Sequence, residues 1–167
     1  MRSASLTTLL IIAIASCSNV GNELPDFHLK TLEGDELTKE NLHGKVTVID
    51  VWATWCHNCA NERESLNRLV ESYQGNPKVV FLGFADEDPE IVSAFLERMP
   101  FKFTPIPAAA DFTSELKTRL VKTYPQHIIL DQNLKIQYEH TGELSNPEET
   151  LSTEIDALLT PKNPEKH

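Results

Sequence analysis

Cys56 and Cys59, two cysteines separated by two residues, have the plainest capacity for chemistry in this sequence. Thiols one helical turn apart can form a disulfide and exchange it with another molecule. They stand between an apolar run at 46–51, typical of a buried strand, and residues 60–73, where apolar side chains recur at helical spacing. The start of a helix favours a thiolate, so we expect Cys56 to be the nucleophile and Cys59 the thiol that resolves a mixed disulfide.

The same two cysteines could instead hold half of a zinc site. A structural zinc ion needs four ligands, and the sequence has no second C-x-x-C and no paired His to complete them. The residue after Cys59 is Ala60 rather than His, which excludes c-type haem attachment. We therefore expect a redox-active disulfide that works without a metal or an organic cofactor.

Residues 52–59, W-A-T-W-C-H-N-C, resemble the active-site motif of thioredoxin-fold oxidoreductases, in particular the membrane-tethered periplasmic TlpA/ResA-like branch. That branch typically has W-A-T-W-C-x-P-C after a buried strand, and here Asn58 replaces the rigid proline. The resemblance extends over residues 24–159. It implies an enzyme that exchanges thiols and disulfides with protein substrates, with reduction as the expected direction and a membrane-embedded donor of electrons.

Asp50 lies in the predicted buried strand, six residues before Cys56, where an isolated carboxylate is costly unless it has a task or a partner. The resemblance implies that this acid takes the proton of the resolving cysteine, although many relatives in the branch have Asn there. The alternative is an acid that caps a local hydrogen-bond network. Asp86 or Glu87, at the end of the next strand, is the expected position of a second active-site acid, unless both are exposed loop residues.

The resemblance also places a cis-proline beside the disulfide, at Pro125, where its backbone would pair with substrate. Tyr124 before it is bulky and would narrow the peptide groove. A protonated His57 would favour the neighbouring thiolate and make the pair more oxidising, whereas an exposed His57 would have little effect. Trp52 and Trp55 are expected to cover the two sulfur atoms, with ordinary packing as the alternative for Trp52.

The third cysteine, Cys17, ends an N-terminal segment with the anatomy of a secretory signal. Arg2 precedes an apolar core at residues 9–14 that is too short to span a membrane. Residues 14–17, I-A-S-C, resemble the bacterial lipobox, which implies cleavage before Cys17 and stable lipid anchoring at that residue. The alternative is an ordinary secretory signal with a chance cysteine. We expect a lipoprotein of the bacterial cell envelope that faces the periplasm.

The length and the net charge of the chain limit the number of domains and the kinds of binding partner. The 167 residues suffice for one domain with a core, and the formal net charge of -10 argues against binding to nucleic acid or to a membrane through basic residues. We divide the chain into a signal peptide at 1–16, a lipidated tether at 17–23, a thioredoxin-like domain at 24–160 and a polar tail at 161–167.

Strands alternate with helices and end in a hairpin plus helix, which predicts an α/β sandwich with a mixed sheet. The resemblance makes this a thioredoxin-like three-layer sandwich, with a TlpA/ResA-type insertion over roughly residues 91–110. Asn133 is expected to take the left-handed position of the hairpin turn. The predicted strands are 46–51, 79–84, 126–130 and 134–138, and the helix that starts at Asp88 is expected to bury Ile91, Val92, Phe95, Leu96 and Met99.

Three other functions stay open at this point. His57 and the missing proline favour an oxidase or isomerase of folding proteins. A peroxide reductase is disfavoured because the Pro-Thr-Cys pattern of peroxidatic cysteines is absent. A binding module could also keep the fold without any redox cycle.

Overall fold

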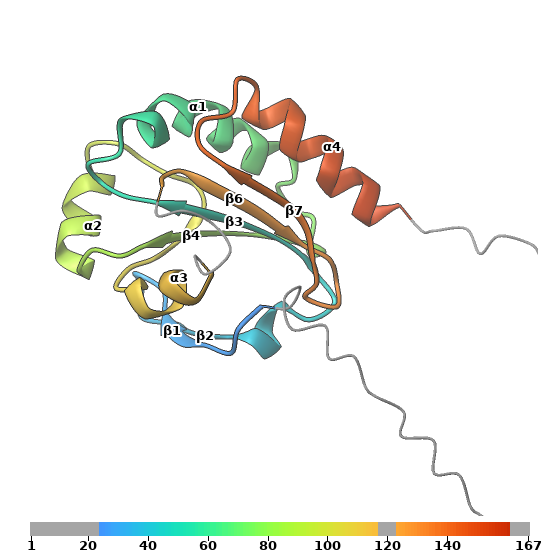
Figure 1. Ribbon diagram of the computed structural model, residues 1–167, viewed down its shortest axis with the longest axis horizontal. Coiled ribbons are helices and arrows are strands. Elements are labelled where there is room, and N and C mark those ends of the chain that lie inside the picture. Colours follow the sequence, from blue (N-terminus) through green and yellow to red (C-terminus); the bar gives the residue numbers. More distant parts are fainter. Residues whose placement is uncertain (1–23, 117–122, 161–167) are drawn as a thin grey trace, which may run out of the picture.

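The computed structural model describes residues 24–116 and 123–160 (Figure 1). The expected signal peptide, Cys17, the tether and the polar tail all lie outside these residues. The elements in chain order are β1 (His28–Lys30), β2 (Glu36–Thr38), the 3-10 helix η1 (Lys39–Leu42), β3 (Val46–Trp52), α1 (His57–Ser72), β4 (Val79–Ala85), α2 (Pro89–Leu96), β5 (Thr104–Ile106), α3 (Ala110–Leu116), β6 (Gln126–Leu130), β7 (Ile136–Thr141) and α4 (Pro147–Leu159).

A five-stranded mixed sheet forms the middle layer, with the strand order β5-β4-β3-β6-β7. β3 pairs in parallel with β4, and β4 in parallel with β5, while β6 runs antiparallel to both β3 and β7. The central strand, β3, is buried along its whole length. Its β-branched, mostly apolar sequence suits that place, because both faces of the strand are covered by other elements.

Alternate residues of β3 face the two outer layers. Val46 and Val48 pack with Leu66 of α1 and with side chains of α4. Ile49 and Val51 pack with side chains of the β1–β2 hairpin, η1 and α3. Figure 1 shows these layers, with α1 and α4 on one side of the sheet and α3 with the small hairpin on the other. The expected three-layer mixed α/β sandwich is confirmed. Asp50, two residues after Val48 on β3, lies on the same face of the strand as Val48 and points toward α1.

The sequence-based expectation for α2 is wrong at two of its five core positions. Val92 is fully buried, but Ile91 is 50% exposed and Met99 is 37% exposed. Ile91 and Val92 are adjacent on the helix and point about 100° apart, and α2 is oriented so that Val92, with Phe95 and Leu96, packs against the core while Ile91 does not. α2 ends at Leu96, so Met99 lies beyond the helix and outside its periodic pattern.

The turn between β6 and β7 also differs from the expectation. The positive φ falls on Leu134, at 62°, rather than on Asn133. One oxygen of Asp131 accepts hydrogen bonds from the backbone N–H groups of Asn133, at 2.8 Å, and Lys135, at 3.0 Å. Leu134 is only 1% exposed. Burial of this side chain in the core compensates for a backbone conformation that a branched residue rarely adopts.

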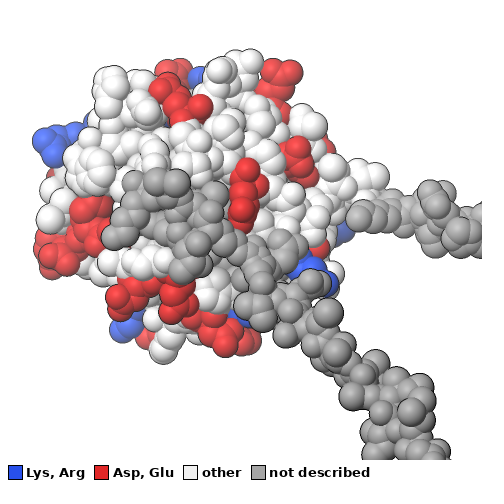
Figure 2. All heavy atoms as spheres, in the orientation of Figure 1, with Lys and Arg blue, Asp and Glu red and all other residues white. Residues whose placement is uncertain are grey.

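Acidic side chains are spread over the face of the molecule shown in Figure 2, and Lys and Arg side chains are fewer there. This agrees with the formal net charge of -10. Among the described residues, no helix combines the length and the apolar character needed to cross a membrane.

Candidate active site

Cys56 and Cys59 form a disulfide at the N-terminus of α1. Cys56 is the N-cap residue, and its Sγ accepts a hydrogen bond from the backbone N–H of Cys59 at 3.1 Å. Cys56 is 7% exposed and Cys59 is 4% exposed, so Cys56 is the more accessible sulfur of a well-buried pair. Free N–H groups and the positive end of the helix dipole therefore surround the sulfur that we expect to act as the nucleophile.

Several of the predicted site residues meet beside the disulfide. The Tyr124–Pro125 peptide bond is cis, as the resemblance implied. The Tyr124 ring packs edge-on against Trp55, with ring centroids 5.3 Å apart. Trp55 is 71% exposed and so does not seal the sulfur atoms, whereas Trp52 is fully buried and packs in the same apolar cluster as both cysteines. A hollow of about 330 Å³ opens here, lined by Trp55, Cys56, His57, Asn58, Thr123 and Tyr124.

A second hollow of about 380 Å³ is lined by Trp55 and by residues of α2. Trp55, Ile91 and Met99 all line it, and these are the large apolar side chains that are exposed among the residues the structure describes. Phe95, Thr54 and Arg98 complete the lining. Trp55 therefore lines two hollows, one that includes Cys56 and one that is mainly apolar.

The two acids at the end of β4 hold other parts of the site in place. Asp86 accepts hydrogen bonds from the hydroxyl groups of Tyr124, at 2.7 Å, and Thr113. Burial, followed by this contact with Asp86, raises the pKa of the Tyr124 hydroxyl. Glu87 accepts hydrogen bonds from Thr54, on the loop before Cys56. In the oxidised structure both acids position their neighbours.

Asp50 lies in a different environment, on the face of β3 that points toward α1. It is 2% exposed, and its partner in the β3–β6 register is His127, which is fully buried. His127 Nδ1 and Asp50 Oδ1 are 3.2 Å apart, within ion-pair distance, although they are off line for a hydrogen bond. The other ring nitrogen, Nε2, is 3.2 Å from Oε2 of Glu62 on α1. Burial lowers the pKa of His127, but its contacts with Asp50 and Glu62 raise it further, to about 9.

Sequence reasoning missed Glu62 and His127. Glu62 lies one turn after Cys59 on the buried side of α1, and a carboxylate at that spacing was an available signal. His127 stands in the otherwise apolar run H-I-I-L, two residues after Pro125. Its importance depends on the register with Asp50, which a single sequence does not display.

Arg63, which follows Glu62, brings a second buried cation to this region. Its guanidinium carbon lies 4.7 Å from the ring centroid of Trp52, 5.1 Å from that of Phe95 and 4.5 Å from that of Phe101. Burial lowers the pKa of Arg63 to about 10, against the raising effect of the Asp50 charge, so the group stays cationic at neutral pH. Cation–π contacts of this kind offset part of the cost of burying the charge.

The chemistry available to this arrangement is disulfide exchange. A thiolate can attack the Cys56 sulfur, which the helix start makes the better leaving and attacking group of the pair. Buried carboxylates on the α1 side of the sheet can take up or return a proton. In the described ranges, no group of three or more His, Cys, Asp or Glu side chains is placed to hold a metal ion.

Comparisons with known proteins agree with this chemistry. The profile of the AhpC/TSA family matches residues 20–139. The chain is 30% identical to the thioredoxin-like protein YneN of Bacillus subtilis over 138 residues, which are 81% of this chain and 79% of YneN. It is 30% identical to the thiol-disulfide oxidoreductase ResA of Bacillus thuringiensis over 125 residues, 74% of this chain and 70% of ResA. Its fold matches a candidate thiol:disulfide interchange protein DsbE from Chlorobium tepidum with a TM-score of 0.72 and 26% identity, over 84% of this chain and 97% of that one.

Proposed function

Since the chain belongs to the AhpC/TSA family and is a thiol–disulfide oxidoreductase, we propose that it reduces protein disulfides outside the cytoplasm, anchored through a lipid on Cys17. The observation that carries this proposal is the Cys56–Cys59 disulfide at the start of α1, beside an exposed Trp55. The likeness to ResA supports the redox chemistry, and the lipobox-like residues 14–17 support the anchor.

The proposed cycle transfers two electrons to the substrate. The Cys56 thiolate attacks one sulfur of a substrate disulfide, which forms a mixed disulfide and releases the other substrate sulfur as a thiolate. Cys59 then loses its proton to Asp50 and attacks the Cys56 sulfur, which closes the Cys56–Cys59 disulfide and releases the second substrate thiolate. A membrane-embedded dithiol donor reduces the disulfide again, and Asp50 returns its proton to Cys59.

Burial of the sulfur pair supports the reducing direction. A strongly oxidising pair has a stabilised thiolate in its reduced form. Here Cys59 is 4% exposed and lies on the face of α1 that also carries the buried Glu62. Burial penalises a thiolate, which favours the disulfide and gives the reduced protein a tendency to donate electrons. The start of α1 favours the Cys56 thiolate and opposes this effect, and His57, which could add to that opposition, is exposed.

The apolar hollow beside Trp55 supports a polypeptide substrate. A substrate bound over the Cys56 sulfur lies next to Trp55, which lines both hollows. An apolar side chain next to the substrate cysteine would cover Ile91 and Met99, which are otherwise exposed to water. We propose that the enzyme selects unfolded or extended segments in which a cysteine lies close to an apolar residue.

Trapping of mixed disulfides tests this function. In Cys59→Ala the second exchange step cannot occur, so protein adducts on Cys56 should accumulate and should disappear on reducing gels. Cys56→Ala is the matched control and should form none. Absence of Cys56 adducts in an extract of the cell envelope would favour the non-redox binding module.

Two further measurements separate the remaining functions. The reduction potential of the Cys56–Cys59 pair should lie closer to that of a thioredoxin, about -270 mV, than to that of a strong oxidant, about -120 mV. A value near the oxidising limit would favour the oxidase or isomerase instead. Cys17→Ser should release the protein from membranes without loss of thiol activity, and continued membrane association would contradict the lipid anchor.

A further inference from the structure

His127 joins the two buried acids on the α1 side of the sheet. Asp50 comes from β3, Glu62 from α1 and His127 from β6, and each of the three is at most 2% exposed. The imidazole touches both carboxylates at 3.2 Å, one with each ring nitrogen. A ring that carries a proton on both nitrogens is the form that can serve two carboxylate oxygens at once.

Charge balance explains why such a group can exist in the core. The two carboxylates face two cations, His127 and Arg63, whose charge acts on Asp50 from α1. From β7, His140 stacks on His127 with ring centroids 6.3 Å apart. Buried ions are tolerated when they are paired, and removing one partner of such a set is costly because a buried charge is left behind.

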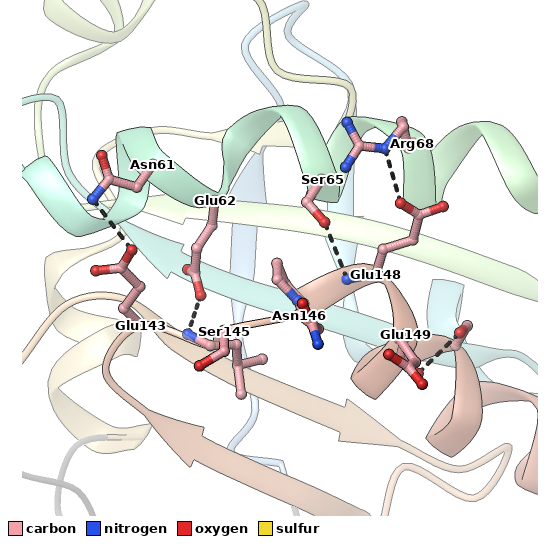
Figure 3. Close-up of a pocket in the computed structure, with 12 residues that line it drawn as sticks. Asn61, Glu62, Ser65, Arg68, Glu143, Ser145, Asn146, Glu148 and Glu149 are labelled. Atoms are coloured by element: carbon pink, nitrogen blue, oxygen red, sulfur yellow. Dashed lines mark hydrogen bonds and ion pairs between the residues drawn. The ribbon is translucent and has the colours of Figure 1, made fainter.

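The Glu62 end of this set lies close to solvent. Glu62 lines a polar cleft of about 510 Å³ between α1 and the loop that joins β7 to α4 (Figure 3). Its Oε1 accepts a hydrogen bond from the backbone N–H of Leu144, while Oε2 faces His127. Asn61 and Arg68, on the same helix, hold the rim of the cleft through Glu143 and Glu148. The set therefore runs from the interior at Asp50 to the floor of a polar cleft.

We propose that His127 is a positioning residue of the resolving step, which holds Asp50 and Glu62 as one buried unit and places a positive charge beside the Asp50 carboxylate that accepts the proton of Cys59. This rests on the proposed role of Cys59 as the resolving thiol. The sulfur chemistry is unchanged by it: the proton passes from the Cys59 thiol to Asp50, the Cys59 sulfur bonds to Cys56, and the substrate thiolate leaves.

The physical reason is the competition between burial and charge. A carboxylate that is buried without a counterion takes up a proton more readily, and a protonated Asp50 cannot accept the proton of Cys59. A cation within about 4 Å opposes this uptake by about one to three pH units. The contact with His127 should therefore set the lowest pH at which the mixed disulfide still resolves quickly.

The pH dependence of the resolving step tests the proposal. His127→Asn retains a neutral N–H donor near the Nδ1 position and His127→Gln retains one near the Nε2 position, and both lack the positive charge. We expect the acidic half-point of the resolution rate, measured in single turnover on a preformed Cys56 mixed disulfide, to rise by about one to three pH units in both variants. Alkylation of Cys56 should keep its wild-type rate. His140→Asn, which removes the stacked neighbour but leaves the bridge intact, should keep the wild-type pH profile.

A measurement on the wild-type protein tests the proposal even if the His127 variants do not fold. Nitrogen-15 NMR of the imidazole should show His127 protonated on both ring nitrogens at pH 7.5. A neutral ring at that pH would overturn the proposal, as would wild-type pH profiles in both folded His127 variants. Failure of the proposed function would look different, because Cys59→Ala would then trap no substrate at all.

Discussion

Glu87 holds Thr54 with a single carboxylate oxygen. Its Oε1 accepts the Thr54 backbone N–H at 2.8 Å and the Thr54 hydroxyl at 2.9 Å. Thr54 stands two residues before Cys56, on the loop that joins β3 to α1. The carboxylate from the end of β4 therefore fixes the backbone that delivers the nucleophile to the helix start.

Replacement of Glu87 by Ala should loosen this loop. Both hydrogen bonds would be lost and a partly buried N–H would be left without its acceptor, so we expect the free energy of unfolding to fall by about 1–3 kcal/mol. Urea denaturation of the oxidised protein measures this. Glu90→Ala, at an exposed position on α2, is the matched control and should change the free energy by less than about 0.5 kcal/mol. Equal effects of the two changes would contradict the role given to Glu87.

Gly83 should not tolerate a methyl group. It pairs with Asp50 in the β3–β4 register, and a Cβ there would lie 3.0 Å from a ring carbon of Phe101 and 3.1 Å from Nε1 of Trp52. Both rings pack on Arg63, so they cannot move apart without disturbing the buried guanidinium. We expect Gly83→Ala to lower the free energy of unfolding by about 1–3 kcal/mol, as measured in urea. A neutral result would show that the rings have room to shift.

The sequence was sufficient for features that are local in the chain. The C-x-x-C pair, the strand before it and the helix after it occupy one short stretch, and their order alone places Cys56 at a helix start. The cis bond before Pro125 followed from the resemblance. The helix begins directly after Cys56, as this order predicts, although the apolar spacing itself becomes visible only from residue 60 onward.

Features that depend on pairing between distant segments could not be predicted in this way. Asp50 was correctly placed in a buried strand, yet its contact with His127 requires the antiparallel register of β3 and β6. Glu62 joins them only because α1 packs on that face of the sheet. The exposure of Ile91 likewise depends on how α2 sits at the edge of the sheet, since its apolar spacing fits a buried face equally well.

The stability of the fold should fall as the pH rises from about 6.5 to 9. The contacts with Asp50 and Glu62 raise the folded-state pKa of His127 from 6.5 to about 9. The stabilising contribution is therefore complete below pH 6.5 and is lost as the pH rises through 9, and a shift of this size corresponds to roughly 3 kcal/mol. Urea denaturation of the oxidised protein at several pH values measures it. The difference in unfolding free energy between wild type and His127→Gln should shrink over this range, and a constant difference would refute the linkage.

Asp50→Asn tests whether the buried acid accepts the proton of Cys59. The two side chains are nearly isosteric, and the amide retains an oxygen for His127, so we expect the fold to persist. Alkylation of Cys56 should change little, because it depends on the helix start. Resolution of a preformed mixed disulfide should slow by on the order of a hundredfold near neutral pH, since Cys59 must lose its proton before it can attack.

The pH dependence separates this role from a structural one. The loss in Asp50→Asn should diminish in alkali, where Cys59 ionises without help. Glu62→Gln is the matched comparison, because it removes the other carboxylate that His127 touches while leaving Asp50 in place. A larger loss in Glu62→Gln would move the proton acceptor to that residue. The Asp50→Asn variant could also resolve the mixed disulfide at the wild-type rate from about pH 6 to pH 9, a range that spans the pKa of a free thiol. That result would show that Asp50 is only a structural partner of His127.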